Sequence, residues 1–293
     1  MKQIAIIAPT ASGKTNLSIS IAKKTNSIIL SLDSLAMYKE IDIASAKPTI
    51  QEQDGIIHFG INEFYPNKSF GVIEFIEVYK RAKACCKQNN KNLIIVGGSS
   101  FYLKSMIDGI SCIPEFSKKT ILWVENKLNN IKDAYSFMFK LDEQYMKTLS
   151  SNDKYRVKKA LLIYKQTGQT PTVYFKNNPP KSIIKDIQLY EIYWSVDDLR
   201  QRIKKRTNMM IKNGLIDEVI YLEKKYTREP KSMQSIGIIE TLEYLDGKIT
   251  KDQLIENIIV NTARLAKRQR TFNNGQFKNI IKNDLDSLEA MLF

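Results

Sequence analysis

The sequence predicts an α/β fold, a parallel β-sheet covered by helices, with an all-helical domain inserted into it. Three observations lead to this prediction. Short, continuous apolar runs occur in the first hundred residues, and each is followed by a polar or glycine-rich turn and a helix-like pattern. A Gly-Lys-Thr turn follows the first of these runs. Between residues 114 and 186 the strand-like runs give way to helical spacing.

The first three strands are predicted at residues 3–7 (QIAII), 28–32 (IILSL) and 93–96 (LIIV). Continuous apolar runs of this length are typical of strands that are buried on both faces, as in a parallel sheet between helices. Residues 187–194 (IQLYEIYW) are a candidate for a fourth strand, and residues 277–282 are a candidate for a fifth. Strands that alternate with helices indicate a doubly wound core.

The segment at 114–186 differs from the rest of the chain in pattern and in charge. Residues 121–128 and 156–164 have helical spacing, and the segment ends near Asn177-Asn178-Pro179-Pro180, a helix stop. It carries 14 Lys and Arg against 7 Asp and Glu, which gives half of the net charge of +14. We therefore predict a core of residues 1–113 and 187–293, with a helical insertion at 114–186.

Composition indicates a globular protein with a polyanionic partner. The 293 residues are 43% hydrophobic and 26% charged, which excludes a disordered chain. A charge of +14 and a pI of about 9.4 favour nucleic acid over a membrane as the partner. A lysine-rich composition without functional meaning is the alternative explanation.

Several classes of protein are excluded by rare residues and by hydropathy. The three cysteines cannot build a disulfide framework or a zinc site, because Cys85 and Cys86 are adjacent and Cys112 stands alone. His58 is the single histidine, so no histidine-rich metal site exists. No apolar run reaches the roughly 20 residues of a membrane span. The strand-like run begins directly after Met1-Lys2, so we expect no signal peptide and a cytoplasmic, reduced protein.

A segment typical of phosphate-binding loops connects the first strand to a helix. Residues 8–15 read APTASGKT, close to the pattern G-x-x-x-x-G-K-[ST], with Ala8 in place of the first glycine. The amides of residues 11–15 can surround a diphosphate at the helix N-terminus, Lys14 can neutralise it, and Thr15 can hold Mg²⁺ through its hydroxyl. The candidate diphosphate- or nucleotide-binding residues are Ala8, Pro9, Thr10, Ala11, Ser12, Gly13, Lys14 and Thr15.

Two other strand ends carry polar side chains. Asp33 ends the second run, and Gly97-Gly98-Ser99 follows the third. The carboxyl ends of neighbouring strands open onto one crevice, so we expect both side chains near the phosphate loop. By position alone, Asp33 can be a metal ligand, a general base or a helix cap, and Ser99 can face the crevice or cap a helix.

These segments resemble the signature of the tRNA dimethylallyltransferases. The resemblance is carried by APTASGKT at 8–15, DSLAMYKEIDIASAKP at 33–48 and GGSSFYL at 97–103. It continues in order, along essentially the whole chain, through YRVKKAL at 155–161, RQRIKKRTNMMIKNGLIDEV at 200–219, SIGIIETLEYLDG at 235–247 and AKRQRTF at 266–272.

The resemblance implies a P-loop kinase-like core whose inserted domain grips the anticodon stem-loop of tRNA. The implied reaction is transfer of a dimethylallyl group from dimethylallyl diphosphate to the exocyclic amine of the adenosine 3′ of the anticodon, with Mg²⁺ as cofactor. It assigns Asp33 as the general base, Ser99 as a hydrogen-bond donor to the leaving oxygen, and Arg206 as a clamp on the diphosphate. We expect the enzyme to act as a monomer.

The tRNA-binding residues follow from the matched motifs and from the basic helices. Arg156, Lys158 and Lys159 fall on adjacent positions of a helix in the basic insertion, and a helix at 234–239 is expected to approach the target. The predicted tRNA-binding set is Asp33, Ser34, Leu35, Ala36, Ser99, Tyr155, Arg156, Val157, Lys158, Lys159, Gln234, Gly237, Lys267 and Arg268.

The chain departs from the family pattern at several positions. Ala8 replaces a glycine, Ser99 replaces a threonine and keeps its hydroxyl, and Ala36 replaces a glutamine. The change at Ala36 removes a side chain able to orient the target base through hydrogen bonds. Three other functions remain open on the residues alone: a small-molecule P-loop kinase, an RNA-binding protein without catalysis, and a prenyltransferase that acts on free adenine nucleotides.

Overall fold

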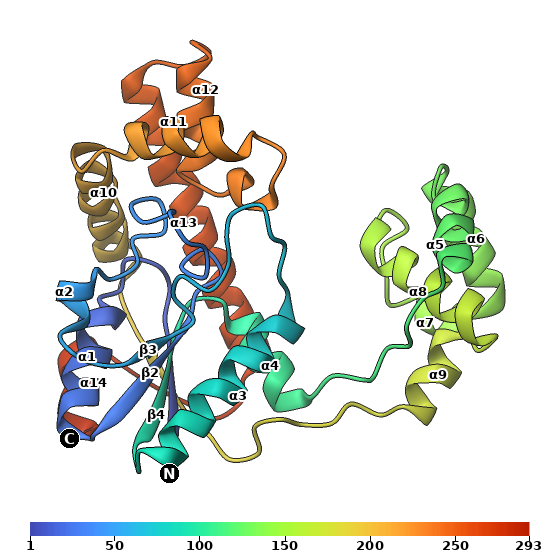
Figure 1. The fold of residues 1–293 in the computed structure, drawn as a ribbon, viewed down its shortest axis with the longest axis horizontal. Helices are drawn as coiled ribbons and strands as arrows, with labels where there is room; N and C mark the ends of the chain where they lie inside the picture. Colours follow the sequence, from blue (N-terminus) through green and yellow to red (C-terminus); the bar gives the residue numbers. More distant parts are fainter. Residues whose placement is uncertain (293) are drawn as a thin grey trace. The chain divides into compact units, whose positions relative to one another are not determined.

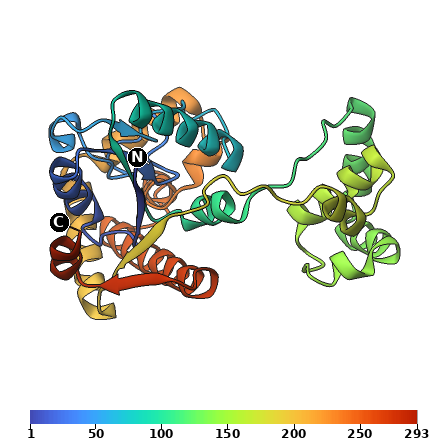
Figure 2. The same ribbon diagram turned by 90° about the horizontal axis from the view of Figure 1, so that it is seen from below.

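The structure, a computed structural model, describes residues 1–292, and these form two compact units (Figures 1 and 2). Unit 1 contains Met1–Ser105 and the residues from Lys185 onward, and unit 2 contains Met106–Ile184. The sequence placed these boundaries at 114 and 186. The first boundary lies earlier because an isolated antiparallel bridge pairs Ile110 with Lys181, which ties the two ends of unit 2 together before residue 114.

Unit 1 is built on a parallel sheet, in which the described residues supply six strands in the order β3-β2-β4-β1-β5-β6. Every pairing between them is parallel, which confirms the predicted α/β class. The strands are β1 (Gln3–Ile7), β2 (Ser27–Leu32), β3 (His58–Phe59), β4 (Asn92–Gly97), β5 (Gln188–Ile192) and β6 (Ile280–Asn283).

The two faces of the sheet are covered by different helices (Figure 1). In β1, Ile6 packs in one cluster with Leu17 of α1 (Lys14–Lys24) and Leu288 of α14 (Leu285–Met291). Helices α1 and α14 lie side by side in both views (Figures 1 and 2). Helix α3 (Val72–Gln88) covers the other face. Burial on both faces explains why the central strands are continuously apolar.

The remaining helices of unit 1 follow the strand ends and the return of the chain from unit 2. Helices α11 (Leu215–Tyr226), α12 (Ile238–Leu245) and α13 (Lys251–Gln276) pack around a second apolar cluster. Within residues 1–292, no helix combines the length and the apolarity that crossing a bilayer requires. These elements are α2 (Ile50–Gln53), α4 (Ser100–Asp108), α10 (Val196–Lys212), α11 (Leu215–Tyr226), the 3-10 helix η1 (Lys231–Gln234), α12 (Ile238–Leu245) and α13 (Lys251–Gln276).

Unit 2 is helical, and its own core includes Val124, Met138, Val157 and Leu161. The predicted helical segments 121–128 and 156–164 correspond to α5 (Lys118–Lys127) and α8 (Lys154–Thr167), which confirms them. Asp142 connects three helices. It directly follows α6 (Ile131–Leu141), and its carboxylate caps α7 (Glu143–Met146) and accepts hydrogen bonds from Thr172 in α9 (Pro171–Asn177). The helices are α5 (Lys118–Lys127), α6 (Ile131–Leu141), α7 (Glu143–Met146), α8 (Lys154–Thr167) and α9 (Pro171–Asn177).

Candidate active site

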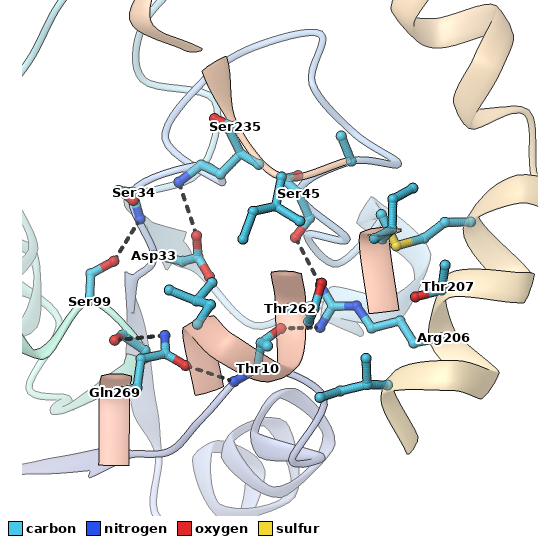
Figure 3. Close-up of a pocket in the computed structure, with 18 of the residues that line it drawn as sticks. Thr10, Asp33, Ser34, Ser45, Ser99, Arg206, Thr207, Ser235, Thr262 and Gln269 are labelled. Atoms are coloured by element: carbon cyan, nitrogen blue, oxygen red, sulfur yellow. Dashed lines mark hydrogen bonds between the residues drawn. The ribbon is translucent and has the colours of Figure 1, made fainter. Parts of the chain in front are cut away.

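A cavity of about 510 Å³ opens beyond the carboxyl ends of β1, β2 and β4 (Figure 3). Thr10 follows β1, Asp33 follows β2, and Gly98 and Ser99 follow β4, so the three strand ends meet as the sequence predicted. A parallel sheet places these ends on one edge and leaves a crevice there. The far walls of the cavity come from α10, from the segment between η1 and α12, and from α13, through Ile203, Arg206, Thr207, Met210, Gln234, Ser235, Ile236, Ile258, Thr262, Leu265 and Gln269.

The phosphate loop has the strand–loop–helix form that its sequence predicts. Gly13 caps α1 with φ +85°, and Ala11 also has a left-handed backbone, with φ +63°. Alternating left-handed residues turn successive amides to one side, which makes an anion site. Ala8 is buried, and its amide donates to the carbonyl of Gly97 at 3.2 Å. Ala8 lies outside the left-handed residues of the loop, so its position does not require the glycine that the usual motif has.

A smaller, more polar cavity beside the loop is lined by Lys14, Thr15, Asp33 and Arg206, among other residues. Burial lowers the pKa of Lys14 to about 8, although the carboxylate of Asp33 opposes that shift and the guanidinium of Arg206 adds to it. Burial also lowers the pKa of Arg206, again against the attraction of Asp33. Two half-buried cations therefore face one carboxylate, and the excess positive charge favours a polyanion.

Asp33 lines both cavities, together with Ser45 and Arg206. Its Oδ1 accepts hydrogen bonds from the amides of Leu35, at 3.0 Å, and Ala36, at 3.4 Å. This local turn fixes the carboxylate in place. The side chain thus stands where the polar cavity of the phosphate loop meets the larger cavity.

Arg206 reaches the site from α10 and is held at both ends of its guanidinium. Nη1 donates to Thr10 Oγ1 at 3.0 Å, and Nη2 donates to the carbonyl of Ser45 at 3.3 Å. Arg206 therefore lies against the phosphate loop although it is 196 positions beyond Thr10, and its predicted role as a clamp on the diphosphate stays a prediction (Figure 3).

Ser99 and the two glycines before it pack closely at the end of β4. The hydroxyl of Ser99 accepts a hydrogen bond from the amide of Ser34 at 3.1 Å, which links the ends of β4 and β2. A Cβ on Gly97 would lie 2.1 Å from the carbonyl oxygen of Leu32, so only glycine allows this approach.

Sequence reasoning missed Gln269, which connects two of the strand ends. Its Nε2 donates to the carbonyl of Gly98 at 3.0 Å, and its Oε1 accepts the amide of Thr10 at 3.2 Å (Figure 3). Gln269 lies in the quoted segment AKRQRTF, and Thr262 and Leu265 share its face of α13 through helical spacing. This helical spacing is the feature of the sequence that groups Gln269 with the other cavity-lining residues of α13.

The predicted tRNA-binding residues of unit 1 are divided between the cavities and the surface. Ser34, Leu35, Ser99 and Gln234 line the larger cavity, and Ala36 lines the smaller one. Lys267 and Arg268 are exposed on α13. Gly237 is buried and lines neither cavity, although Ser235 and Ile236 before it line the larger one.

The predicted helix at 234–239 is wrong. The 3-10 helix η1 ends at Gln234, and α12 begins at Ile238 after Gly237, whose φ is +92°. A left-handed residue cannot continue a right-handed helix, so the chain breaks there. The amide of Gly237 donates to Glu240 Oε2 at 2.6 Å and stabilises the new helix start.

In unit 2, the predicted residues lie near the N-terminus of α8, but one of them faces inward. Tyr155 is 71% exposed, Arg156 is exposed, and Lys158 and Lys159 are half-buried. Val157 is fully buried in the core of the unit, so its side chain cannot contact tRNA and the prediction for it is wrong.

The residues present fit a magnesium ion beside the loop. The hydroxyl of Thr15 and the carboxylate of Asp33 line the same small cavity, and both are the hard oxygen ligands that Mg²⁺ prefers. Mg²⁺ takes one or two protein ligands with substrate phosphates and water, so no larger carboxylate cluster is needed. Among residues 1–292, no group of three or more His, Cys, Asp or Glu side chains forms a separate metal site.

Comparison with known proteins gives consistent matches along the chain. A sequence model of the family described as IPP transferase matches residues 36–276. The tRNA dimethylallyltransferase of Aliarcobacter butzleri is 58% identical over 99% of this chain and 97% of its own length. The enzyme of the same name from Sulfurimonas denitrificans is 53% identical over 100% and 98%.

Solved structures show the same likeness. The tRNA isopentenylpyrophosphate transferase of Bacillus halodurans aligns with a TM-score of 0.73 at 28% identity, over 99% of this chain and 94% of that one. A eukaryotic dimethylallyltransferase acting on tRNA aligns with a TM-score of 0.85 at 25% identity, over 98% of this chain and 75% of that one.

Proposed function

This chain belongs to the IPP transferase family, and on that premise we propose the reaction that its site performs. As a member, it is a tRNA-modifying prenyltransferase. We propose that it transfers a dimethylallyl group from dimethylallyl diphosphate to the exocyclic amine of the adenosine 3′ of the anticodon. Atoms balance as the amine nitrogen bonds the allylic carbon, the carbon–oxygen bond to diphosphate breaks, and one amine proton leaves.

The observation that carries the proposal is the position of Asp33 between the two cavities. On one side lie the phosphate loop, Lys14 and Arg206, which suit a diphosphate leaving group. On the other side lies a larger cavity whose walls are mostly apolar and which suits an allyl group and an extruded base. A carboxylate at this junction is placed to take the proton that the amine loses.

The loop and its cations lower the barrier by neutralising the leaving group. The amides at the start of α1, Lys14 and Arg206 bind the diphosphate oxygens. Thr15 would hold Mg²⁺, which would supply further charge neutralisation on the diphosphate when it is bound, and Asp33 stays free to act as the base. The hydroxyl of Ser99 accepts from Ser34 and keeps its own hydrogen for the bridging oxygen of the leaving group.

Binding of tRNA is proposed to use basic residues of both units. Arg156, Lys158 and Lys159 on α8 and Lys267 and Arg268 on α13 supply positive charge for phosphate contacts. The target base is stacked in its loop and must be extruded to reach Asp33. Gln234 lines the larger cavity and carries an amide able to read the base edge, the kind of group that Ala36 lacks.

One assay tests this function directly. The protein is incubated with labelled dimethylallyl diphosphate, Mg²⁺ and unmodified tRNA that carries adenosine next to the anticodon. Label in the RNA is the expected result, and a matched tRNA with guanosine at that position is the control. Tight tRNA binding without label would indicate a protein that has lost catalysis. Transfer of label to AMP in a parallel incubation that contains AMP, with no label in the tRNA, would contradict the proposed acceptor.

A further inference from the structure

We propose that Trp194 and Arg202 are positioning residues. They hold the phosphate loop in its anion-binding conformation through hydrogen bonds to its backbone carbonyls. Neither residue lines the cavities, and neither was a candidate on sequence grounds. The inference deepens the proposed function and rests on it in one respect, namely that the loop binds a diphosphate.

Both residues bind backbone carbonyls of the loop. The indole Nε1 of Trp194, just after β5, donates to the carbonyl of Ser12 at 2.9 Å. Nε of Arg202, on α10, donates to the carbonyl of Ala11 at 2.7 Å. The guanidinium carbon of Arg202 lies 4.4 Å from the centroid of the Trp194 ring, so the two side chains also support each other.

Carbonyls held in this way determine where the loop amides point. In a trans peptide, the carbonyl of one residue and the amide of the next point in opposite directions. Fixing the carbonyls of Ala11 and Ser12 therefore fixes the amides of Ser12 and Gly13 on the other side of the loop. Within the part of the chain that the structure describes, those two amides donate to no protein acceptor, whereas the amide of Thr10 is used by Gln269.

The loop needs such support because its conformation is unfavourable without it. Ala11 has a side chain and yet adopts φ +63°, which L-residues rarely do. At Gly13, a Cβ would meet Arg202 Nη2 at 3.2 Å and Leu285 Cδ1 at 3.0 Å, so the loop is in close contact with this support. A preformed anion site avoids the cost of ordering the loop when the diphosphate arrives.

The test uses inorganic pyrophosphate with Mg²⁺ as the probe, measured by calorimetry on the full chain. Trp194→Phe keeps the ring face for Arg202 and removes the N–H donor, and Arg202→Lys keeps the charge and removes the Nε geometry. We expect each variant to weaken pyrophosphate binding by about fivefold to tenfold, in line with the loss of one hydrogen bond. The double variant should lose less than the product of the two effects, because both act on one loop.

The chain offers matched controls. Trp123→Phe, in unit 2, makes the same chemical change at the other tryptophan, and Arg200→Lys changes an exposed arginine on the same helix. Both should bind pyrophosphate within twofold of the wild type. A positioning role also predicts a selective effect, with a raised KM for dimethylallyl diphosphate and a KM for tRNA that stays within twofold.

Three results would overturn the inference. The first is pyrophosphate binding within twofold of the wild type in both Trp194→Phe and Arg202→Lys. The second is an equal loss of pyrophosphate and tRNA affinity, which would indicate a general folding defect. The third needs no change at the site: Trp123→Phe leaves Trp194 as the sole tryptophan, and its fluorescence should shift on addition of pyrophosphate. A constant spectrum during saturable binding would contradict the proposed coupling, and a wild type that binds no pyrophosphate would overturn the proposed function itself.

Discussion

At the scale of single residues, the site depends on two half-buried cations that share one carboxylate. Lys14 and Arg206 come from distant parts of the chain, and burial lowers the pKa of both. Asp33 compensates part of their charge and is itself held by the amides of Leu35 and Ala36. Because its negative charge favours the protonated forms of Lys14 and Arg206, the same carboxylate helps to keep these two side chains positive. It is also available as the base.

Asp33→Asn is expected to lower kcat by a factor of about 10² to 10⁴, the usual contribution of a general base. Asparagine keeps the oxygen that accepts from the amides of Leu35 and Ala36, so the local turn should persist. Single-turnover transfer of labelled dimethylallyl groups measures the effect, and tRNA affinity should stay within a few-fold. Asp54→Asn, on an exposed loop, is the control. Near-normal turnover in Asp33→Asn would show that another group takes the proton.

Lys14 gives the diphosphate site a defined pH dependence. Its pKa of about 8 belongs to the free protein, and a bound anion raises that pKa because it favours the charged form. Affinity for pyrophosphate should therefore be greatest below pH 8 and should fall as the pH rises above it, by up to about tenfold per unit. Calorimetry between pH 7 and 9 should also detect proton uptake on binding.

The matched variant for this dependence is Lys14→Arg. A guanidinium stays charged across the range from pH 7 to 9, so the variant should bind pyrophosphate with little pH dependence. An equally steep decrease in the variant would assign the titration to another group of the protein, because pyrophosphate itself only gains negative charge as the pH rises.

At the scale of elements, hydropathy predicted the strands well and predicted the joints between elements poorly. The runs at 3–7, 28–32 and 93–96 stood out because the central strands are buried on both faces. The strand β3 was missed because its two residues, His58 and Phe59, are too few to form a run. The break at Gly237 was missed because only the backbone angle distinguishes a glycine inside a helix from one before it.

Helix periodicity also explains which part of the insertion was misassigned. Val157, Ala160 and Leu161 recur at helical spacing and form the buried face of α8. Val157 was predicted to bind tRNA because it lies within the motif YRVKKAL, next to the exposed Tyr155 and Arg156. The helical period puts Val157 on the buried face of α8 and puts Tyr155 and Arg156 on its exposed face.

The side chain of Asp142 holds helices α6, α7 and α9 together. Burial would raise its pKa, but hydrogen bonds from Thr172 and Tyr145 outweigh this and lower it. A lowered pKa means that Asp142 stabilises the fold above its unfolded pKa of about 3.9 and that this stabilisation is lost as the pH falls below it. Asp142→Asn should lower the free energy of unfolding by about 2 kcal/mol at pH 7.

The measurement for Asp142 is hydrogen exchange of the peptides that cover residues 131–177, in the full chain. Exchange in this region should accelerate in Asp142→Asn at pH 7, and the difference in stability from the wild type should shrink below pH 4. Glu143→Gln, which removes an exposed ion pair with Lys147, should change stability little. Equal protection in the two variants would contradict the role given to Asp142.

At the scale of the whole molecule, the site is assembled from segments that are far apart in the sequence. The phosphate loop, Asp33 and Ser99 could be placed together in advance, because strand ends of a parallel sheet meet at one edge. Gln269 and Trp194 could not, because their contacts depend on how α13 and the end of β5 pack against the loop. The helical spacing that Gln269 shares with Thr262 and Leu265 puts these residues on one face of α13, but it does not say that this face packs against the loop, and no local pattern encodes the contact of Trp194.

The charge of the molecule gives a prediction for tRNA binding as a whole. Half of the net charge of +14 lies in residues 114–186, where Arg156 is exposed at the start of α8. If Arg156 contacts one phosphate, Arg156→Ala should weaken tRNA binding and reduce the slope of log affinity against log salt by about one. Arg156→Lys keeps the positive charge and should keep the slope. Comparing it with Arg156→Ala separates the effect of the charge from the effect of the guanidinium geometry. A slope that is unchanged in Arg156→Ala would remove the start of α8 from the tRNA interface, and the positive charge of unit 2 would then need another explanation.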